Sequence, residues 1–125
     1  MVDDEPDITY TLKTTLEDSE FFHVDTFNDA ELALSVFRSG LYDLAVLDIR
    51  MPEMDGFQLC RKLRSIDYKI KICFLTTTDL HYYTETDSDI INDLGKDCFV
   101  SKPVDNEDLV GRLKSMLFGA DQKNS

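Results

Sequence analysis

Charged residues that could take part in chemistry occur at three separate places in the sequence, and two of these places follow a short apolar run. Asp3 and Asp4 are adjacent near the start, Asp48 follows the apolar residues 45–47, and Lys102 follows the apolar residues 98–100. Grouped carboxylates repel one another unless a cation joins them, and their hard oxygen atoms suit Mg²⁺. If the three places converge, the sequence predicts a divalent-metal site beside a lysine.

Each of these residues alone has a plainer interpretation. An Asp-Asp pair is most often a solvated turn or cap, Asp48 could cap the next turn, and Lys102 could be an ordinary surface lysine. The spacing of all three places must therefore carry the argument, and the elements that position them come next.

Helical and strand patterns alternate along the chain. Apolar residues at helical spacing after Pro6 predict a first helix, and 22–27 is a short β-favouring run. Asn28 is a candidate N-cap with Glu31 three residues later, and this second helix ends at Gly40. Its expected apolar stripe consists of Leu32, Val36 and Phe37.

The second half of the chain repeats this alternation. Strands are predicted at 43–48, 70–75 and 98–100, and helices at 57–64, 87–94 and 104–118. Pro52 and Gly56 mark the turn after the first of these strands, and Gly95 closes the middle helix. The last helix is expected to bury Leu109, Leu113, Met116 and Leu117.

Strands that alternate with helices imply a parallel sheet covered on both faces, so the expected fold is a three-layer α/β/α doubly wound domain. Sites in such sheets form beyond the carboxyl ends of the strands. Asp3, Asp4, Asp48 and Lys102 should then meet in one cleft.

Composition limits the class of protein. The 125 residues, 42% of them hydrophobic, suffice for one core, and we expect one domain at 1–118 with a polar tail at 119–125. A formal charge of −12 argues against direct binding to nucleic acid or to a membrane. With no leader or long apolar run, and with Cys60, Cys73 and Cys98 expected as free, reduced, buried thiols, the cytoplasm is the expected compartment.

Four segments resemble the receiver domains of response regulators in two-component signalling, and in particular the chemotaxis regulators. They are Val2-Asp3-Asp4-Glu5-Pro6, Leu47-Asp48-Ile49-Arg50-Met51-Pro52-Glu53-Met54-Asp55-Gly56, Leu75-Thr76-Thr77 and Phe99-Val100-Ser101-Lys102-Pro103. The resemblance implies a flavodoxin-like strand order 2-1-3-4-5. Only Met1 and Val2 stand where the family has a complete first strand, so we expect that strand to be truncated.

The resemblance also implies roles for single residues. Asp48 corresponds to the phosphoacceptor, and the metal ligands for Mg²⁺ or Mn²⁺ would be Asp3, Asp4, Asp48 and the backbone carbonyl of Arg50. Thr76 and Lys102 would contact the phosphoryl group.

Thr76 and Phe99 would form the switch, although Phe99 alone would pass for a core aromatic residue. The bond between Lys102 and Pro103 is commonly cis in this family.

The function implied is a phosphoacceptor switch, not an enzyme beyond its own Mg²⁺-dependent phosphorylation and dephosphorylation. A sensor histidine kinase would be the donor, a downstream effector protein or domain would respond, and a homodimer is possible. The alternative is a degenerate receiver that acts as a constitutive interaction module. A phosphatase or phosphomutase ranks last, because Asp48-Ile49-Arg50 lacks a carboxylate two residues after Asp48.

Other residues have structural interpretations. Met51 and Met54 are expected to pack the turn after Asp48, and His23 and His81 to lie on the surface. The segment 79–89 is either a solvated acidic loop or, through Tyr82 and Tyr83, part of a partner surface.

Overall fold

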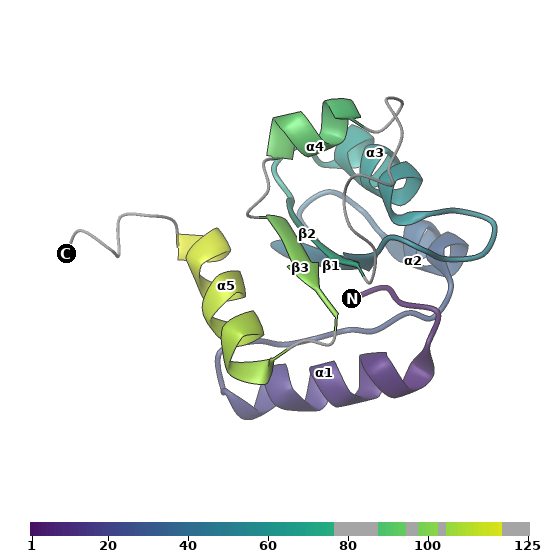
Figure 1. Cartoon of the computed structure of the whole chain (residues 1–125). Coiled ribbons are helices and arrows are strands. Elements are labelled where there is room, and N and C mark those ends of the chain that lie inside the picture. Colours follow the sequence, from purple (N-terminus) through teal and green to yellow (C-terminus); the bar gives the residue numbers. More distant parts are fainter. Residues whose placement is uncertain (77–87, 95–97, 103–104, 119–125) are drawn as a thin grey trace.

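The computed structural model describes residues 1–76, 88–94, 98–102 and 105–118, in which helices alternate with strands (Figure 1). In chain order the elements are α1 (Pro6–Asp18), α2 (Ala30–Val36), β1 (Leu44–Asp48), α3 (Gly56–Ile66), β2 (Lys71–Thr76), α4 (Ser88–Leu94), β3 (Phe99–Ser101) and α5 (Asn106–Phe118). The predicted alternation is confirmed except at 22–27. The boundaries of the three strands and of α3, α4 and α5 that can be compared agree with the predictions within two residues, whereas α2 ends at Val36 and not at Gly40.

The strands form one parallel sheet in the order β1-β2-β3. Val2 extends this order on the β1 side, because it makes parallel bridges both to Leu47 and to Phe27. The segment that ends at Phe27, Val2, β1, β2 and β3 therefore follow one another in the predicted 2-1-3-4-5 order. The first strand is reduced to one bridging residue, as expected.

Helices cover both faces of the sheet, which gives the predicted three layers (Figure 1). On one face α1 and α5 contact each other and bury Leu12, Leu16, Leu109 and Leu113 against Val46 and Leu75. On the other face α2, α3 and α4 enclose Leu47, Ile72 and Phe74. Because β1 and β2 are buried on both faces, they are apolar almost throughout.

Residues 22–27 do not form the strand that the sequence predicts. The segment bridges only at Phe27, opposite Val2. A strand needs a continuous neighbour to satisfy its backbone, and the neighbour of this segment is a single residue. The β-favouring residues therefore lie beside the sheet, as predicted, but they do not form a continuous row of strand hydrogen bonds.

The start of α2 differs from expectation in two respects. The N-cap is Asp29, not Asn28, and its side chain accepts hydrogen bonds from the backbone N–H groups of Glu31 and Leu32. Leu32 and Val36 are exposed rather than buried, at 54% and 44%. The buried residues of the helix are small, Ala30 and Ala33, and α2 contacts α3.

On α5, Leu109 and Leu113 are buried as predicted, whereas Met116 and Leu117 are only partly buried. Met54 is buried and Met51 packs against the same core, and the side chain of His23 is 87% exposed, all as expected.

The three cysteines are free. Cys60 and Cys73 are buried, and desolvation raises the thiol pKa of Cys60 to about 11 and that of Cys73 to about 12. Cys98 is only half-buried, which differs from the expectation for that residue. Within the described part of the chain, no helix combines the length and apolar character that a membrane crossing would require.

Candidate phosphoacceptor and metal site

The three carboxylates are brought together because the backbone at Val2 runs beside the end of β1. Asp48 ends β1, and Val2 pairs beside it through two hydrogen bonds, Val2 N–H to the Val46 carbonyl (2.8 Å) and Asp48 N–H to the Val2 carbonyl (2.9 Å). Asp3 and Asp4 follow Val2 directly. Oxygen atoms of Asp3, Asp4 and Asp48 consequently lie within 4.8 Å of one another.

Lys102 reaches the same cluster from the end of β3. Its backbone N–H donates to the Thr76 carbonyl at 2.8 Å, which aligns it with the end of β2. Its ammonium group lies 2.8 Å from Asp3 Oδ2 and 3.3 Å from Asp48 Oδ1, and the lysine side chain is only 8% exposed. The predicted convergence of the three charged places is confirmed.

Burial and charge determine how these groups titrate. Desolvation, followed by repulsion from Asp3, raises the pKa of Asp48 from 3.8 to about 6, and Lys102 partly opposes this rise. For Lys102 desolvation acts to lower the pKa, but its hydrogen bond to Asp3 and the negative charges of Asp3 and Asp48 together raise it. The lysine therefore stays protonated at neutral pH. Its one positive charge does not remove the repulsion of Asp3 and Asp4 on Asp48.

Asp3 is held by contacts that the sequence did not reveal. The Asn28 side-chain amide donates to the Asp3 carbonyl (2.8 Å) and to Thr9 Oγ1 (3.0 Å). Asp3 Oδ1 accepts from the Glu5 N–H at 3.0 Å. Asn28 was expected to cap α2, but its side chain instead binds the backbone of Asp3, a candidate metal ligand. The two residues are 25 positions apart, and the sequence contains no local signal for such a contact.

The turn after Asp48 depends on a glycine. A Cβ atom at Gly56 would lie 2.5 Å from the Asp48 carbonyl oxygen and 2.9 Å from Ile49 Cα, both backbone atoms. The Gly56 N–H donates to the Ile49 carbonyl at 2.8 Å, and Asp55 forms a capping box with Gln58 at the start of α3. The Asp-Gly pair of the motif thus folds the turn back against the strand end that carries Asp48.

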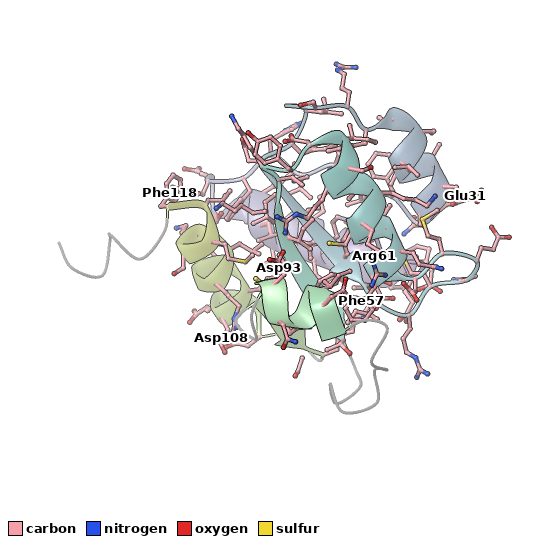
Figure 2. The ribbon with its side chains drawn as sticks, turned by 90° about the horizontal axis from the view of Figure 1, so that it is seen from above. Glu31, Phe57, Arg61, Asp93, Asp108 and Phe118 are labelled. Atoms are coloured by element: carbon pink, nitrogen blue, oxygen red, sulfur yellow. The ribbon has the colours of Figure 1, made fainter. Side chains whose placement is uncertain are left out.

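The predicted switch residues lie next to this cluster. Thr76 ends β2 and is buried, with 5% of its surface exposed. Phe99 belongs to the core on the α3 side, where its ring stacks on Phe74 at 5.0 Å and lies 6.3 Å from Phe57. Figure 2 labels Phe57 on α3, and its ring contacts with Phe74 and Phe99 connect that helix to β2 and β3.

A divalent cation fits the chemistry of this site. Three carboxylates offer hard oxygen ligands at short mutual distance, and the single positive charge of Lys102 cannot neutralise them. Arg50 is exposed two residues after Asp48. Thr77, His81, Tyr82, Tyr83, Gly95 and Pro103, with the peptide bond before Pro103, lie outside the described residues.

The fold is thus a parallel sheet with helices on both faces, and an acidic cluster with a lysine lies at the carboxyl edge of that sheet. The family model for the response regulator receiver domain matches residues 1–114. The chain belongs to this family, the receiver domains of two-component signalling.

Relatives agree with this assignment. The chain is 34% identical over 117 residues to the response regulator GtcR of Aneurinibacillus migulanus, covering 94% of this chain and 46% of that protein. It is 34% identical over 119 residues to the heme response regulator HssR of Staphylococcus aureus, covering 94% of this chain and 50% of that protein. The chain thus spans about half the length of the curated relatives it matches.

Solved structures resemble the fold along almost the whole chain. A CheY-like receiver domain protein of Methanospirillum hungatei has a TM-score of 0.79 at 27% identity and covers 99% of this chain and 94% of that one. The response regulator DrrB of Thermotoga maritima, an OmpR/PhoB homologue, has a TM-score of 0.75 at 25% identity and covers 94% of this chain and 50% of that one.

Proposed function

We propose that this receiver domain is a phosphoacceptor switch in which Asp48 takes a phosphoryl group from a sensor histidine kinase. The observation that carries the proposal is the position of Asp48, 5% exposed at a strand end, with its Oδ1 3.3 Å from the Lys102 ammonium group. With a pKa of about 6, Asp48 is mostly ionised at neutral pH and therefore available as a nucleophile.

In the transfer step an Asp48 oxygen forms a bond to phosphorus while the bond from phosphorus to the donor's leaving atom breaks. Lys102 pairs with the oxygens of the transferring group, and Thr76 offers a hydroxyl from the end of β2. Asp3, Asp4, Asp48 and the Arg50 carbonyl would hold Mg²⁺ or Mn²⁺, which supplies positive charge to the phosphoryl oxygens. Asn28 and the Glu5 amide keep Asp3 in place for that role.

The response would pass to the face formed by α4, β3 and α5. Phosphorylated Asp48 adds acceptor oxygens beside Thr76, and movement of Thr76 would change the space available to Phe99. Because Phe99 stacks on Phe74 and lies near Phe57, a change in its rotamer would alter the packing between β3 and α3.

The remaining parts of the proposal concern context. A downstream effector protein or domain reads the switch, a homodimer of receivers is compatible with it, and the domain occupies residues 1–118 with a polar tail at 119–125. The cytoplasm is the expected compartment. The charge of −12 argues against direct nucleic-acid contact by this domain.

Intact-mass measurement after incubation with Mg²⁺ and acetyl phosphate tests the proposal. The chain should gain one phosphate, and Asp48→Asn should gain none. The matched control is Asp43→Asn, the same substitution just before the opposite end of β1, which should behave as the unchanged chain. An equal gain by the Asp48→Asn variant would disprove the assignment, and no gain by any of the three would favour the constitutive interaction module.

A further inference from the structure

After α1 the chain reverses and runs back alongside that helix toward α2 (Figure 1). The reversal includes Glu20, which has a positive φ of 61°. The returning residues 21–27 include three Phe and one Val and no Pro. A segment of this composition pairs readily with another strand when its backbone groups are left open, so the state of its outer edge decides whether it can do so.

The backbone of this segment presents successive residues to opposite sides. The Phe27 N–H and carbonyl groups face the interior of the sheet, because they bond to the Met1 carbonyl (2.9 Å) and the Asp3 N–H (3.1 Å). The Asp25 carbonyl faces the same way and accepts from the Met1 nitrogen at 2.9 Å. Backbone groups alternate along an extended chain, so those of Val24 face outward. Among the described residues no strand lies beyond them.

Two side chains of α1 take the place of a strand at that outer edge. Lys13 Nζ donates to the Val24 carbonyl at 2.7 Å, and Glu17 Oε2 accepts from the Val24 N–H at 3.1 Å. Lys13 and Glu17 are one helical turn apart, and their charged groups lie 3.7 Å from each other. Both outward backbone groups of Val24 are therefore bonded to a charged side chain, and such bonds are stronger than those between neutral groups.

Val24 is the central residue of this edge. Phe22 and Thr26 are two positions away on either side, so their backbone groups face outward as well. Within the described part of the chain, these groups of Phe22 and Thr26 have no hydrogen-bond partner. Loss of the two bonds at Val24 would therefore leave a continuous open edge from residue 22 to residue 26.

We propose that Lys13 and Glu17 form a cap on the sheet edge at Val24, and that this cap prevents the edge from pairing with the same edge of a second copy of the chain. Two copies of the edge related by a two-fold axis run antiparallel, and each then offers N–H groups to the carbonyl groups of the other. Pairing requires the outward groups of Val24, which the cap already occupies. The edge is thus a surface for self-association that α1 holds closed.

The test compares the unchanged chain with the double variant Lys13→Ala/Glu17→Ala. The matched control is Asp18→Ala/Lys62→Ala, which also removes one carboxylate and one ammonium group from helices, so the net charge is the same in all three proteins. The readouts are solution mass over a series of protein concentrations and hydrogen exchange of the Val24 amide. Neither involves phosphate or metal, so failure here leaves the proposed phosphoacceptor function untouched.

In dilute solution the Val24 amide of the double variant should exchange about tenfold faster or more than in the unchanged chain, because it has lost its acceptor. As the concentration rises, the solution mass of this variant should double relative to that of the unchanged chain, and protection of Val24 should return. The control should behave as the unchanged chain. Glu17→Gln should do so too, because its amide oxygen still accepts from Val24.

Three results would overturn the proposal. Val24 exchange in the double variant as slow as in the unchanged chain would show that the cap does not close the edge. Fast exchange without any increase in mass would show that the cap is not what prevents pairing. A dimer in which Val24 stays unprotected would mean that the copies meet elsewhere. If the double variant does not fold, Glu17→Ala, which retains Lys13, is subject to the same three criteria.

Discussion

The two sides of β1 differ sharply in how they are supported. Toward β2, all five residues from Leu44 to Asp48 are paired in register with Lys71 to Leu75. On the other side, among the residues that the structure describes, only Val2 bridges to β1, at Leu47. The phosphoacceptor candidate Asp48 therefore belongs to a continuous sheet, whereas Asp3 and Asp4 follow a single bridging residue. Asp3 is held in addition by Asn28 and Lys102.

Core truncations should show the largest difference between the two sides. Leu75→Ala removes a fully buried side chain from β2 and should cost about 2–5 kcal/mol in unfolding free energy. Val2→Ala should cost only about 1–2 kcal/mol, because it removes two side-chain carbon atoms where Leu75→Ala removes three. Urea unfolding of both variants measures this, and equal costs would mean that the Val2 side is as well supported as the β2 side.

The turn that holds Asp48 should be almost as sensitive. Gly56→Ala places a Cβ atom 2.5 Å from the Asp48 carbonyl oxygen, so the backbone must shift, at a cost of about 1–3 kcal/mol and with slower phosphorylation by acetyl phosphate. Gly111→Ala on α5 is the control, because its Cβ would meet nothing within 4 Å. That control should gain about 0.5–1 kcal/mol, and a comparable loss in both variants would contradict the proposed crowding.

Removing the charge of Asp48 should stabilise the metal-free fold. The folded-state pKa of Asp48 is raised from 3.8 to about 6, so the folded protein binds this proton more tightly than the unfolded chain does. Its contribution to stability is therefore lost as pH rises through that window.

At neutral pH, Asp48→Asn should gain roughly 1–3 kcal/mol relative to the unchanged chain in the presence of a chelator. The gain should shrink toward pH of about 4. Denaturant unfolding at several pH values checks this, with Asp43→Asn as the control, and a gain independent of pH would rule out titration of Asp48 as the cause.

The Mg²⁺ affinity of single variants should distinguish residues that bind the metal from residues that only lie beside it. Asp4→Ala should weaken Mg²⁺ binding about tenfold or more, because it removes a candidate ligand. Lys102→Ala and Thr76→Ala should change affinity much less while impairing phosphorylation-dependent signalling more. Calorimetric Mg²⁺ titration provides the measurement. A loss of affinity for Lys102→Ala equal to that for Asp4→Ala would contradict the prediction that Lys102 is not a metal ligand.

The smallest expected effect concerns the weakly supported side itself. Adding the four apolar residues Val-Ile-Val-Ile ahead of Met1 should tighten Mg²⁺ binding a few-fold, because Asp3 and Asp4 would then extend from a paired strand. A polar extension of equal length, Ser-Asp-Ser-Asp, should leave the affinity unchanged. Identical titration curves for the two extended chains would show that Asn28 and Lys102 already hold Asp3 firmly enough.

Much of this architecture could be predicted from local patterns. The buried strands in 43–48 and 70–75 are mostly apolar, and α1 and α5 show helical spacing, because these patterns follow from which residues face apolar layers. The predictions failed where a partner decided the outcome. Segment 22–27 pairs only at Phe27 and does not form a strand, and α2 buries Ala30 and Ala33 while Leu32 and Val36 are exposed.

The sequence by itself determined the order of the elements and which residue types could end the strands, including Asp48 and Lys102, since these follow from composition and short-range spacing. Only the tertiary structure decided that Asn28 binds the Asp3 backbone, that Gly56 must lack a side chain beside Asp48, and that Val2 lies between Leu47 of β1 and Phe27. These contacts join residues that are far apart in the chain or depend on tenths of an ångström. Neither condition leaves a periodic signal, because each is set by how whole layers pack.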